Sequence, residues 1–390
     1  MIPARHPPKP ALSRQRVRSL LWQAALAVLL AALLWQLWHN VQANLDARQI
    51  RSGFGFLFEQ AGFDVSEGPV AYTAQDTYLL AFAAGVANTL RVALAAIVTA
   101  TLIGIVVGVG RLARNPLVRG VCTAYVEAIR NTPLIIQLFG WYVAISELLP
   151  DTADAMHLAP HVTLSKSGLQ LPSPVWTVGW TLGLAGLALG IALLFFLRRR
   201  ALARRLATAH MPAWAPLAWA MPFVCALAGW LLGGAPTAWD FPEAGTFAIT
   251  GGMALSPEFL ALYLGLSIYT ASYIAEIVRA GITAVARGQR EASHALGLSR
   301  LQQLRLVVFP QALRLIVPPL SSQYLNLTKN SSLAVAVGYP DLVSIANTSL
   351  NQNGQALECL AIIMLVYLCT SLATASFMHW FDRRVALVER

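Results

Sequence analysis

The sequence is poor in charge and especially poor in lysine. Only 12% of its 390 residues are Asp, Glu, Lys or Arg, about half the fraction that a soluble domain carries. Lysine occurs only at Lys9, Lys166 and Lys329. Hydrophobic residues make up 57% of the chain, and the mean hydropathy is +0.59. Because these residues form blocks of roughly 20, long enough to cross the hydrocarbon core of a bilayer, we predict an all-α membrane protein that crosses the bilayer several times.

The chain also lacks the short motifs of common catalytic and metal-dependent proteins. No G-x-x-x-x-G-K-[ST] motif surrounds any lysine, and no H-E-x-x-H motif occurs. The four cysteines lie in apolar segments, which favours buried thiols over a disulfide framework. His157 and His161 are four residues apart and could share a helix face, but surface histidines are the favoured interpretation. No Ser/His/Asp or Cys/His signature is present, so we predict no catalytic residue and no metal site.

Eight segments are candidate membrane spans, at approximately residues 20–39, 84–109, 120–148, 175–197, 214–234, 257–280, 304–326 and 356–380. The sequence RNTP interrupts the third. The seventh contains Arg314 and three prolines, so it can be broken or partly re-entrant. The first resembles a signal peptide with a poor cleavage site at Ala43, but its apolar block is long for one, and we favour a retained span.

Basic residues are distributed unevenly among the loops between these spans. The loops 1–19, 110–119, 198–213, 281–303 and 381–390 contain nineteen Arg and Lys residues, whereas the alternate loops contain four. Basic residues concentrate on the cytoplasmic side of a membrane. We therefore predict that both termini are cytoplasmic. The net charge of +10 could also indicate a nucleic-acid partner, but topology explains it better, and we predict no such partner.

The predicted organisation has four parts. Residues 1–83 form a cytoplasmic N-terminus, the first span and an external loop. Residues 84–148 begin the membrane core, and 149–256 are an insertion with a Pro-rich external stretch and two extra spans. Residues 257–390 complete the core and include the loop 288–310. No loop is long enough to bury a separate soluble core.

The segment 288–314, GQREASHALGLSRLQQLRLVVFPQALR, is basic and has a helical pattern, although apolar spans flank it. Residues 290–296 favour a helix, which Gly297 can end in left-handed backbone geometry. Ser299 and Gln302 fit the S-x-x-Q pattern of a capping box, which begins a second helix. We therefore predict two short helices that meet at an angle around Gly297.

The ends of this helix pair carry further predictions. We expect Glu291 at the N-terminus of the first helix, where the helix dipole favours a carboxylate, and Pro310 at the start of the next span. Ala292, Ala295 and Leu298 fall near the bend. A cytoplasmic knuckle of this kind is suited to docking in a groove of a partner protein. An ordinary connecting loop is the alternative.

Several ionisable residues fall within the predicted spans, where isolated charge is costly. They are Arg91, the pair Glu127 and Arg130, the pair Glu276 and Arg279, and Arg314. The members of each pair are three residues apart and can interact on one helix face. Structural pairing or snorkelling is the alternative to a functional role, and we favour structural pairing for Glu276 and Arg279.

Two polar stretches can line a path for a substrate. Pro133 removes a backbone donor and disfavours helix at the preceding residue, and loosened backbone at membrane depth can bind a zwitterion. The seventh span has its own polar run at Ser321, Ser322, Gln323, Asn326 and Lys329. We hypothesise that Gln137, Gln323 and Asn326 face a translocation cavity. The full set of candidate path residues is Arg130, Asn131, Thr132, Gln137, Gln323, Asn326 and Lys329.

The segment 288–310 resembles the EAA loop of permease subunits in bacterial ABC importers. The pattern reads Glu291, Ala292, Ser293, then Gly297 and Pro310. Ser293 departs from the usual alanine, and Phe309 departs from the usual leucine. The resemblance implies that this loop, with Leu298 after the glycine, is the coupling helix that fits a cleft on an ATPase subunit.

Four further stretches resemble the polar amino-acid branch of these permeases. They are NTLRVAL at 88–94, RNTPLIIQLF at 130–139, SYIAEIVRAGI at 272–282 and KNSSLA at 329–334, and the matches together cover about 84–145 and 257–385. Asn330 stands where many members of this branch carry aspartate. The extra first span and the insertion resemble the long permeases of general L-amino-acid or glutamate/glutamine/aspartate/asparagine systems.

This resemblance implies about eight transmembrane helices around a type I ABC-importer core, in a bacterial inner membrane. It implies a second, similar permease subunit, an ABC ATPase dimer that binds ATP and Mg, and a periplasmic amino-acid-binding protein. The chain itself would hold no cofactor, and either permease could hold the main substrate site. A secondary transporter driven by an ion gradient is the alternative, but we see neither the inverted repeats nor the midplane ion site expected of it. An intramembrane enzyme or a scaffold finds less support.

Overall fold

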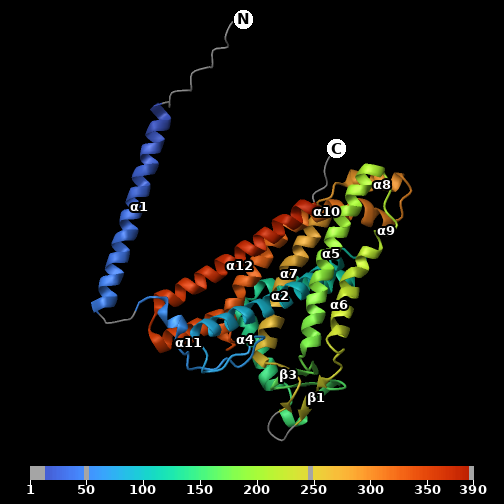
Figure 1. The fold of residues 1–390 in the computed structure, drawn as a ribbon. Coiled ribbons are helices and arrows are strands. Elements are labelled where there is room, and N and C mark those ends of the chain that lie inside the picture. The colour runs from blue at the N-terminus through green and yellow to red at the C-terminus, as the bar shows by residue number, and fades with distance from the viewer. Residues whose placement is uncertain (1–13, 48–51, 245–248, 386–390) are drawn as a thin grey trace. The chain divides into compact units, whose positions relative to one another are not determined.

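The computed structural model describes residues 14–47, 52–244 and 249–385 (Figure 1). Its longer helices are α1 (Arg14–Ala47), α2 (Tyr78–Gly110), α3 (Pro116–Asn131), α4 (Leu134–Leu148), α5 (Val178–Thr208), α6 (Met221–Leu232), α7 (Pro257–Thr283), α10 (Phe309–Asn330), α11 (Leu342–Asn353) and α12 (Ala356–Val385). Two shorter helices are α8 (Arg287–Ala295) and α9 (Arg300–Gln303). Single helical turns lie at Phe54–Phe58, Thr152–Asp154, Leu217–Ala220, Leu304–Val308 and Ser331–Ala336.

The helices confirm the prediction of an α-helical protein with several membrane spans. Six helical segments among the described residues are long and apolar enough to cross a membrane, and two shorter apolar helices lie at Leu134–Leu148 and Leu217–Leu232. Seven of the eight predicted spans each fall on one of these helices, and the third, 120–148, falls on α3 and α4. The third is divided at Pro133 into α3 and α4, because proline ends the first helix and caps the second. The seventh is a continuous helix despite Pro318 and Pro319.

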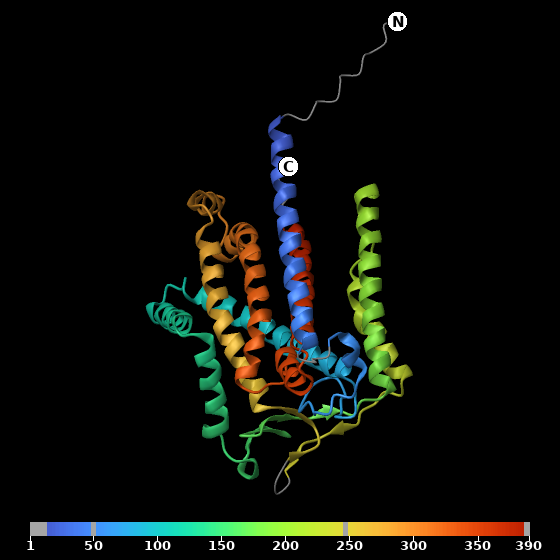
Figure 2. The same cartoon turned by 90° about the vertical axis from the view of Figure 1, so that its left-hand side faces the viewer.

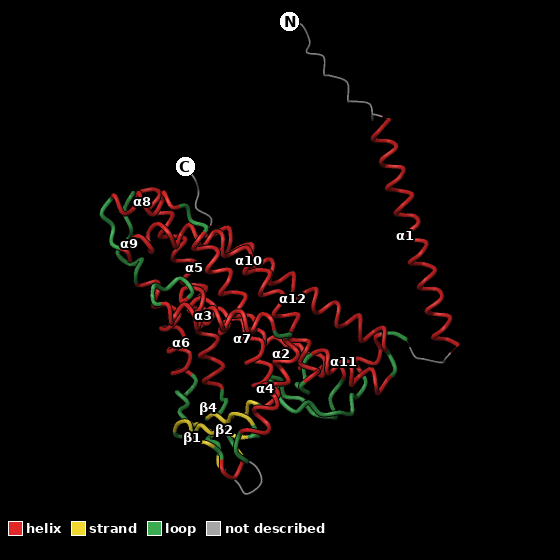
Figure 3. Tube along the Cα trace, turned by 180° about the vertical axis from the view of Figure 1, so that it is seen from behind, coloured by secondary structure: helices red, strands yellow, loops and turns green. Residues whose placement is uncertain are grey.

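Eight short strands lie within the described residues and were not predicted. Strands β1 (Met156–Ala159), β2 (Val162–Ser165), β3 (Gly168–Leu171) and β8 (Met253–Leu255) form one antiparallel sheet in the order β1-β2-β3-β8. Two-stranded pairs join β4 (Ser173–Pro174) to β5 (Trp239–Asp240) and β6 (Glu243–Ala244) to β7 (Ile249–Thr250). Figure 3 shows these strands in yellow among the red helices.

The strands correct one expectation about a helix face. His157 lies on β1, and His161 lies in the turn that follows, so the two histidines do not share a helix. The His161 ring instead packs on Phe241, with 4.4 Å between ring centroids. The strands are only two to four residues long, too short for a clear period-two pattern, which explains why the sequence did not reveal them.

The chain divides into two compact units. One contains the described parts of residues 1–87 with 342–369, and the other contains 88–341 with the described part of 370–390. In the first unit, the ring of Phe56 packs edge-on against Tyr78, with centroids 5.4 Å apart. The backbone N–H of Gly53 donates to Glu358 Oε1 at 2.6 Å, which ties the loop before α2 to the start of α12. Cys359 is buried here, whereas Cys369 is exposed, so the expectation of burial is wrong for Cys369.

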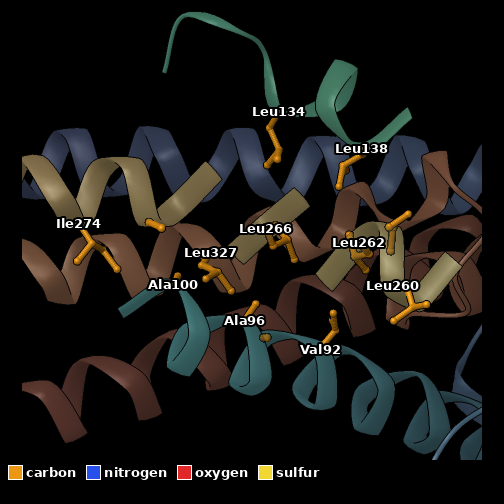
Figure 4. Packing of buried hydrophobic residues seen from close by; sticks show 14 of the residues in the cluster. Val92, Ala96, Ala100, Leu134, Leu138, Leu260, Leu262, Leu266, Ile274 and Leu327 are labelled. Carbon is orange, nitrogen blue, oxygen red and sulfur yellow. The ribbon is translucent and has the colours of Figure 1, made fainter. Parts of the chain in front are cut away.

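The second unit is built around α7. Leu262, Leu266 and Ile274 are fully buried on this helix, and Figure 4 shows them between Val92, Ala96 and Ala100 of α2, Leu134 and Leu138 of α4, and Leu327 of α10. The residues that α2 presents are spaced four apart, so they form one stripe along that helix. Alanine in this stripe permits a close approach between helices.

Two glycines extend the α2 stripe to the end of the helix. A Cβ on Gly104 would lie 2.6 Å from Ile274 Cβ, and one on Gly108 would lie 2.7 Å from the carbonyl oxygen of Ala275. The two positions form a G-x-x-x-G pattern, which allows membrane helices to pack backbone to backbone. Helix α2 therefore contacts α7 without room for any larger residue at these positions.

In the second unit, the strands and the helix pair α8–α9 lie at opposite ends of α7 (Figures 1 and 2). Helices α5 and α6 pack side by side as a hairpin that begins near the strands. The C-terminus of α5 lies at the same end of this unit as α8 and α9.

Candidate functional site

The candidate coupling site is a helical knuckle of residues 287–308, which follows α7. Helix α8 ends at Ala295 with Leu296 as its C-cap, and the next residue, Gly297, has a left-handed φ of +73°. The Gly297 N–H donates to the His294 carbonyl at 2.9 Å, and the Leu298 N–H donates to the Ser293 carbonyl at 3.2 Å. These two bonds form a Schellman motif. The predicted glycine stop is confirmed. No atom lies within 4 Å of a Cβ built on Gly297, so backbone conformation alone demands glycine here.

The second half of the knuckle begins with the predicted capping box. The Ser299 N–H donates to Gln302 Oε1 at 2.9 Å, and the Gln302 N–H donates to Ser299 Oγ at 3.4 Å. After α9, the chain passes through a π-helical turn at Leu304–Val308 and continues directly into α10. Pro310 falls in the first turn of α10, directly after the π turn. Such π turns often accompany functional sites.

A hydrogen-bond group around the buried Ser293 locks the two halves of the knuckle together. Gln303 Nε2 donates to the Arg290 carbonyl at 2.6 Å and to Ser293 Oγ at 2.7 Å. Ser293 Oγ also donates to the Arg290 carbonyl at 2.8 Å, and only 3% of Ser293 is exposed. Arg290 Nη2 donates to the Ile282 carbonyl near the end of α7 at 2.5 Å. The serine that replaces the usual alanine therefore has a structural partner in Gln303.

The outer face of the knuckle exposes apolar side chains. Leu296 is 80% exposed and Leu301 is 74% exposed. Glu291 and Ala292 are exposed as well, whereas Leu298 is half-buried. Large exposed apolar residues on a short polar segment are typical of the anchors that fill a pocket on a partner. Leu296 was not among the predicted coupling residues, although its place directly before the glycine could have indicated it.

The structure corrects the position expected for Glu291. Helix α8 begins at Arg287, so Glu291 lies in its second turn and no acidic residue occupies the first. The helix dipole acts mainly within the first turn. Favourable interaction with the dipole therefore does not explain this glutamate, and its exposed carboxylate is free to meet a partner.

An ion-pair group ties α7 to the end of α2. Glu276 bonds to Arg279 on its own helix, with 2.5 Å between Oε1 and Nη2, as the i, i+3 spacing predicted. Its other oxygen pairs with Arg111, which follows α2. The Arg111 side chain is only 13% exposed. This second arginine was not predicted, because it lies 165 residues from Glu276 in the sequence.

The RNTP break is stabilised by Gln137, which is one of the residues predicted to face the translocation cavity. Gln137 Nε2 donates to the carbonyls of Ile129 and Thr132, both at 2.9 Å, and Gln137 is only 9% exposed. Pro133 leaves these carbonyls at the end of α3 without their usual helical donors. The two bonds give the Gln137 amide nitrogen a structural role, whereas its Oε1 is buried without a hydrogen-bond partner among the described residues.

The other residues of the RNTP break have different surroundings. Arg130 lies over the ring of Tyr273, with 5.0 Å from Cζ to the ring centroid, and it forms no ion pair with Glu127 in the structure. Asn131 is exposed, and Thr132 is half-buried. The Thr132 hydroxyl donates to the Ala128 carbonyl at 3.0 Å. Arg130 and Asn131 remain available to a ligand.

The candidate path residues on α10 share one face. Ser322, Asn326 and Lys329 are exposed and follow one another at helical spacing, whereas Gln323 is half-buried. None of the described hydrogen bonds joins this face to the RNTP break. The neighbouring Tyr324 hydroxyl instead bonds to Thr101 on α2 at 2.9 Å. The exposed α10 face is therefore a better candidate for a polar substrate path than the RNTP break.

Two further residues of the family-like stretches serve packing. Asn88 is fully buried, and its Nδ2 donates to the Pro340 carbonyl at 2.9 Å. Arg91 lies over the ring of Phe259, with 4.6 Å from Cζ to the ring centroid. A cation–π contact of this kind stabilises the charged arginine within a membrane core.

The geometry defines a multi-span membrane protein with a locked helical knuckle at one end of its central helix. A family model for the "binding-protein-dependent transport system inner membrane component" matches residues 185–387. The chain belongs to this family, and the predicted resemblance to ABC-importer permeases is confirmed. It is therefore a multi-pass inner-membrane protein.

Relatives match the chain over almost its whole length. The general L-amino acid transport system permease protein AapQ of Rhizobium johnstonii is 44% identical, over 97% of this chain and 95% of the relative. The putative amino-acid ABC transporter permease protein YhdX of Escherichia coli is 43% identical, over 96% and 95%. The glutamate/glutamine/aspartate/asparagine transport system permease protein BztB of Rhodobacter capsulatus is 37% identical, also over 96% and 95%.

Proposed function

We propose that this chain is the transmembrane permease subunit of an ATP-driven importer for polar L-amino acids. The observation that carries the proposal is the 44% identity to a general L-amino acid permease over 97% of this chain. A second relative of similar coverage is named for glutamate, glutamine, aspartate and asparagine. The same range of substrates, or a broader one, is therefore proposed for this chain.

The knuckle of residues 287–308 would couple the permease to a separate ATPase dimer. Its lock of Arg290, Ser293 and Gln303 fixes the angle between α8 and the π turn. Leu296 and Glu291 are exposed on the outer face, where they can enter a cleft. The chain has no P-loop of its own, so ATP and Mg would bind to the ATPase, and this chain would perform no catalysis.

The proposed complex has two further members. A second, homologous permease subunit would complete the translocation path, and an external binding protein would deliver the amino acid. Arg130, Asn131, Asn326 and Lys329 are the residues of this chain best placed to meet the substrate, because their polar groups are exposed. Gln323 and Thr132 are half-buried and would therefore be less accessible to the substrate.

The orientation we propose has the knuckle and both chain termini in the cytoplasm. The basic loops 110–119, 198–213 and 281–303 then face inward. In the second unit, the strands lie at the opposite end of α7 from the knuckle, which supports an external location for the strands (Figure 1). Residues 1–13 and 386–390, which belong to the predicted cytoplasmic ends, lie outside the described residues.

The proposal is tested by comparing Gly297→Ala with Gly288→Ala. Gly297 has a left-handed φ, whereas Gly288 lies within α8, has no left-handed φ and has no atom within 4 Å of an added Cβ. Alanine in left-handed geometry costs about 1–2 kcal/mol. We expect Gly297→Ala to weaken binding of the cognate ATPase in detergent by roughly five- to thirtyfold. Gly288→Ala should bind as the wild type does.

Uptake into proteoliposomes tests the substrate separately. The complete complex should import radiolabelled L-glutamate or L-glutamine only when ATP and the binding protein are both present. Uptake by this chain alone, driven by an ion gradient, would show a secondary transporter instead. Failure of the wild type to bind any amino-acid-importer ATPase would overturn the proposed coupling.

A further inference from the structure

We propose that the insertion hairpin and the end of α12 form a binding site for one anionic phospholipid. A cavity of about 1160 Å³ lies among the end of α5, the segment 211–219 and the end of α12. Three arginines line it, Arg198, Arg199 and Arg384, together with Trp219 and Trp380, and its lining contains no acidic residue. The proposal depends on the cytoplasmic orientation of this end but not on the transported substrate.

Arg198 and Arg199 lie where the apolar part of α5 ends. The helix runs through the apolar sequence LALGIALLFFL before Arg198, so this arginine marks a boundary between hydrocarbon and headgroups. Phe195, one turn earlier, also lines the cavity and is 54% exposed. The cavity thus has an apolar part toward the hydrocarbon and a basic part toward the surface, as a phospholipid requires.

Aromatic rings orient two of the arginines. Arg198 Cζ lies 4.5 Å from the centroid of Trp219, and Arg384 Cζ lies 5.0 Å from the centroid of Trp380. Stacking on a ring holds the plane of a guanidinium while its N–H edges stay free to donate. No described carboxylate lies within ion-pair distance of either arginine. Paired N–H donors on fixed guanidinium groups match the oxygens of a phosphate.

A lipid fits these observations better than a soluble anion. Trp219 is 57% exposed and Trp380 is 46% exposed, so a free phosphate would leave much apolar surface uncovered. Basic pockets between membrane helices on the cytoplasmic side can bind anionic headgroups. The single phosphate and the acyl chains of phosphatidylglycerol satisfy both parts of the cavity, and we expect that class of lipid.

The test measures lipid binding to the full-length protein in detergent by native mass spectrometry. The site variant combines Arg198→Gln, Arg199→Gln and Arg384→Gln. The control combines Arg204→Gln, Arg205→Gln and Arg383→Gln, which remove the same charge from exposed residues of the same helices that do not line the cavity. We expect the first phosphatidylglycerol to bind the site variant at least about tenfold more weakly than the wild type. The control should stay within about twofold.

A second variant keeps the test valid if the triple site variant does not fold. Trp219→Leu retains every charge but removes the ring beneath Arg198, so it should weaken phosphatidylglycerol binding by about two- to fivefold. Equal binding of phosphatidylcholine and phosphatidylglycerol to the wild type would overturn the proposal. Displacement of phosphatidylglycerol by millimolar inorganic phosphate would show a soluble-anion site and overturn it as well. Equal losses of phosphatidylglycerol affinity in the site variant and the control would show that net charge alone causes the effect, and would overturn the proposal.

Discussion

Replacing Gln303 with leucine should loosen the knuckle without unfolding the membrane core. The substitution removes the donor to the Arg290 carbonyl at 2.6 Å and to Ser293 Oγ at 2.7 Å. Ser293 is only 3% exposed, so water cannot readily replace the lost donor. A buried polar group without its partner costs about 1–3 kcal/mol. Because the Arg290 carbonyl keeps its bond from Ser293, we expect about 1–2 kcal/mol, the lower part of that range.

Hydrogen exchange of the backbone amides of residues 287–297 measures this loss directly. A decrease of about 1–2 kcal/mol in the free energy of local opening corresponds to exchange roughly five- to thirtyfold faster. Peptides from α7 should exchange as in the wild type, because the lock lies outside the membrane core.

A matched control is available two turns further along the chain. Gln311 donates to Gln289 at 3.3 Å in an exposed position, so Gln311→Leu should change local stability by less than about 0.5 kcal/mol. Unchanged exchange in Gln303→Leu would refute the reasoning. An equal effect of the two substitutions on the free energy of local opening would also refute it, because the bonds to the buried Ser293 region would then contribute no more than an exposed bond.

Two further predictions concern the contact between α2 and α7. Gly108→Leu should lower the thermal midpoint of the purified protein or prevent folding, because a Cβ there would lie 2.7 Å from a backbone oxygen of α7 and overpacking typically costs about 1–3 kcal/mol. Gly120→Leu, with no atom within 4 Å, should leave the midpoint unchanged, and equal midpoints would contradict the close packing. Glu276→Gln should destabilise the fold by about 1–3 kcal/mol, because it removes the charge that faces the largely buried Arg111. Denaturant unfolding that matches the wild type would show that this ion pair contributes nothing.

The features that the sequence predicted well are those encoded within a few residues. Gly297 and the pair Ser299 and Gln302 act on backbone groups three to five residues away. Their geometry therefore follows from local backbone groups. The spans are local in the same sense, because a run of apolar residues is sufficient to select a membrane environment.

Gln137 shows what local reasoning leaves open. Gln137 is polar, lies in a predicted span and follows a helix break, which together favoured a place in the cavity. The structure instead turns its amide to the carbonyls of Ile129 and Thr132. A broken helix needs donors for its last carbonyls, and the sequence does not show whether a nearby polar side chain satisfies that need or faces a ligand.

The sequence alone determined the membrane class, the positions of the spans, the uneven distribution of basic residues among the loops and the bend at Gly297. Only the tertiary structure determined the lock between Gln303 and Ser293, the second arginine on Glu276 and the close packing of Gly104 and Gly108 on α7. The physical reason is the range of each interaction. Hydropathy and capping act within a turn or along one helix. A buried hydrogen bond, ion pair or helix contact depends on which distant segments the fold brings together.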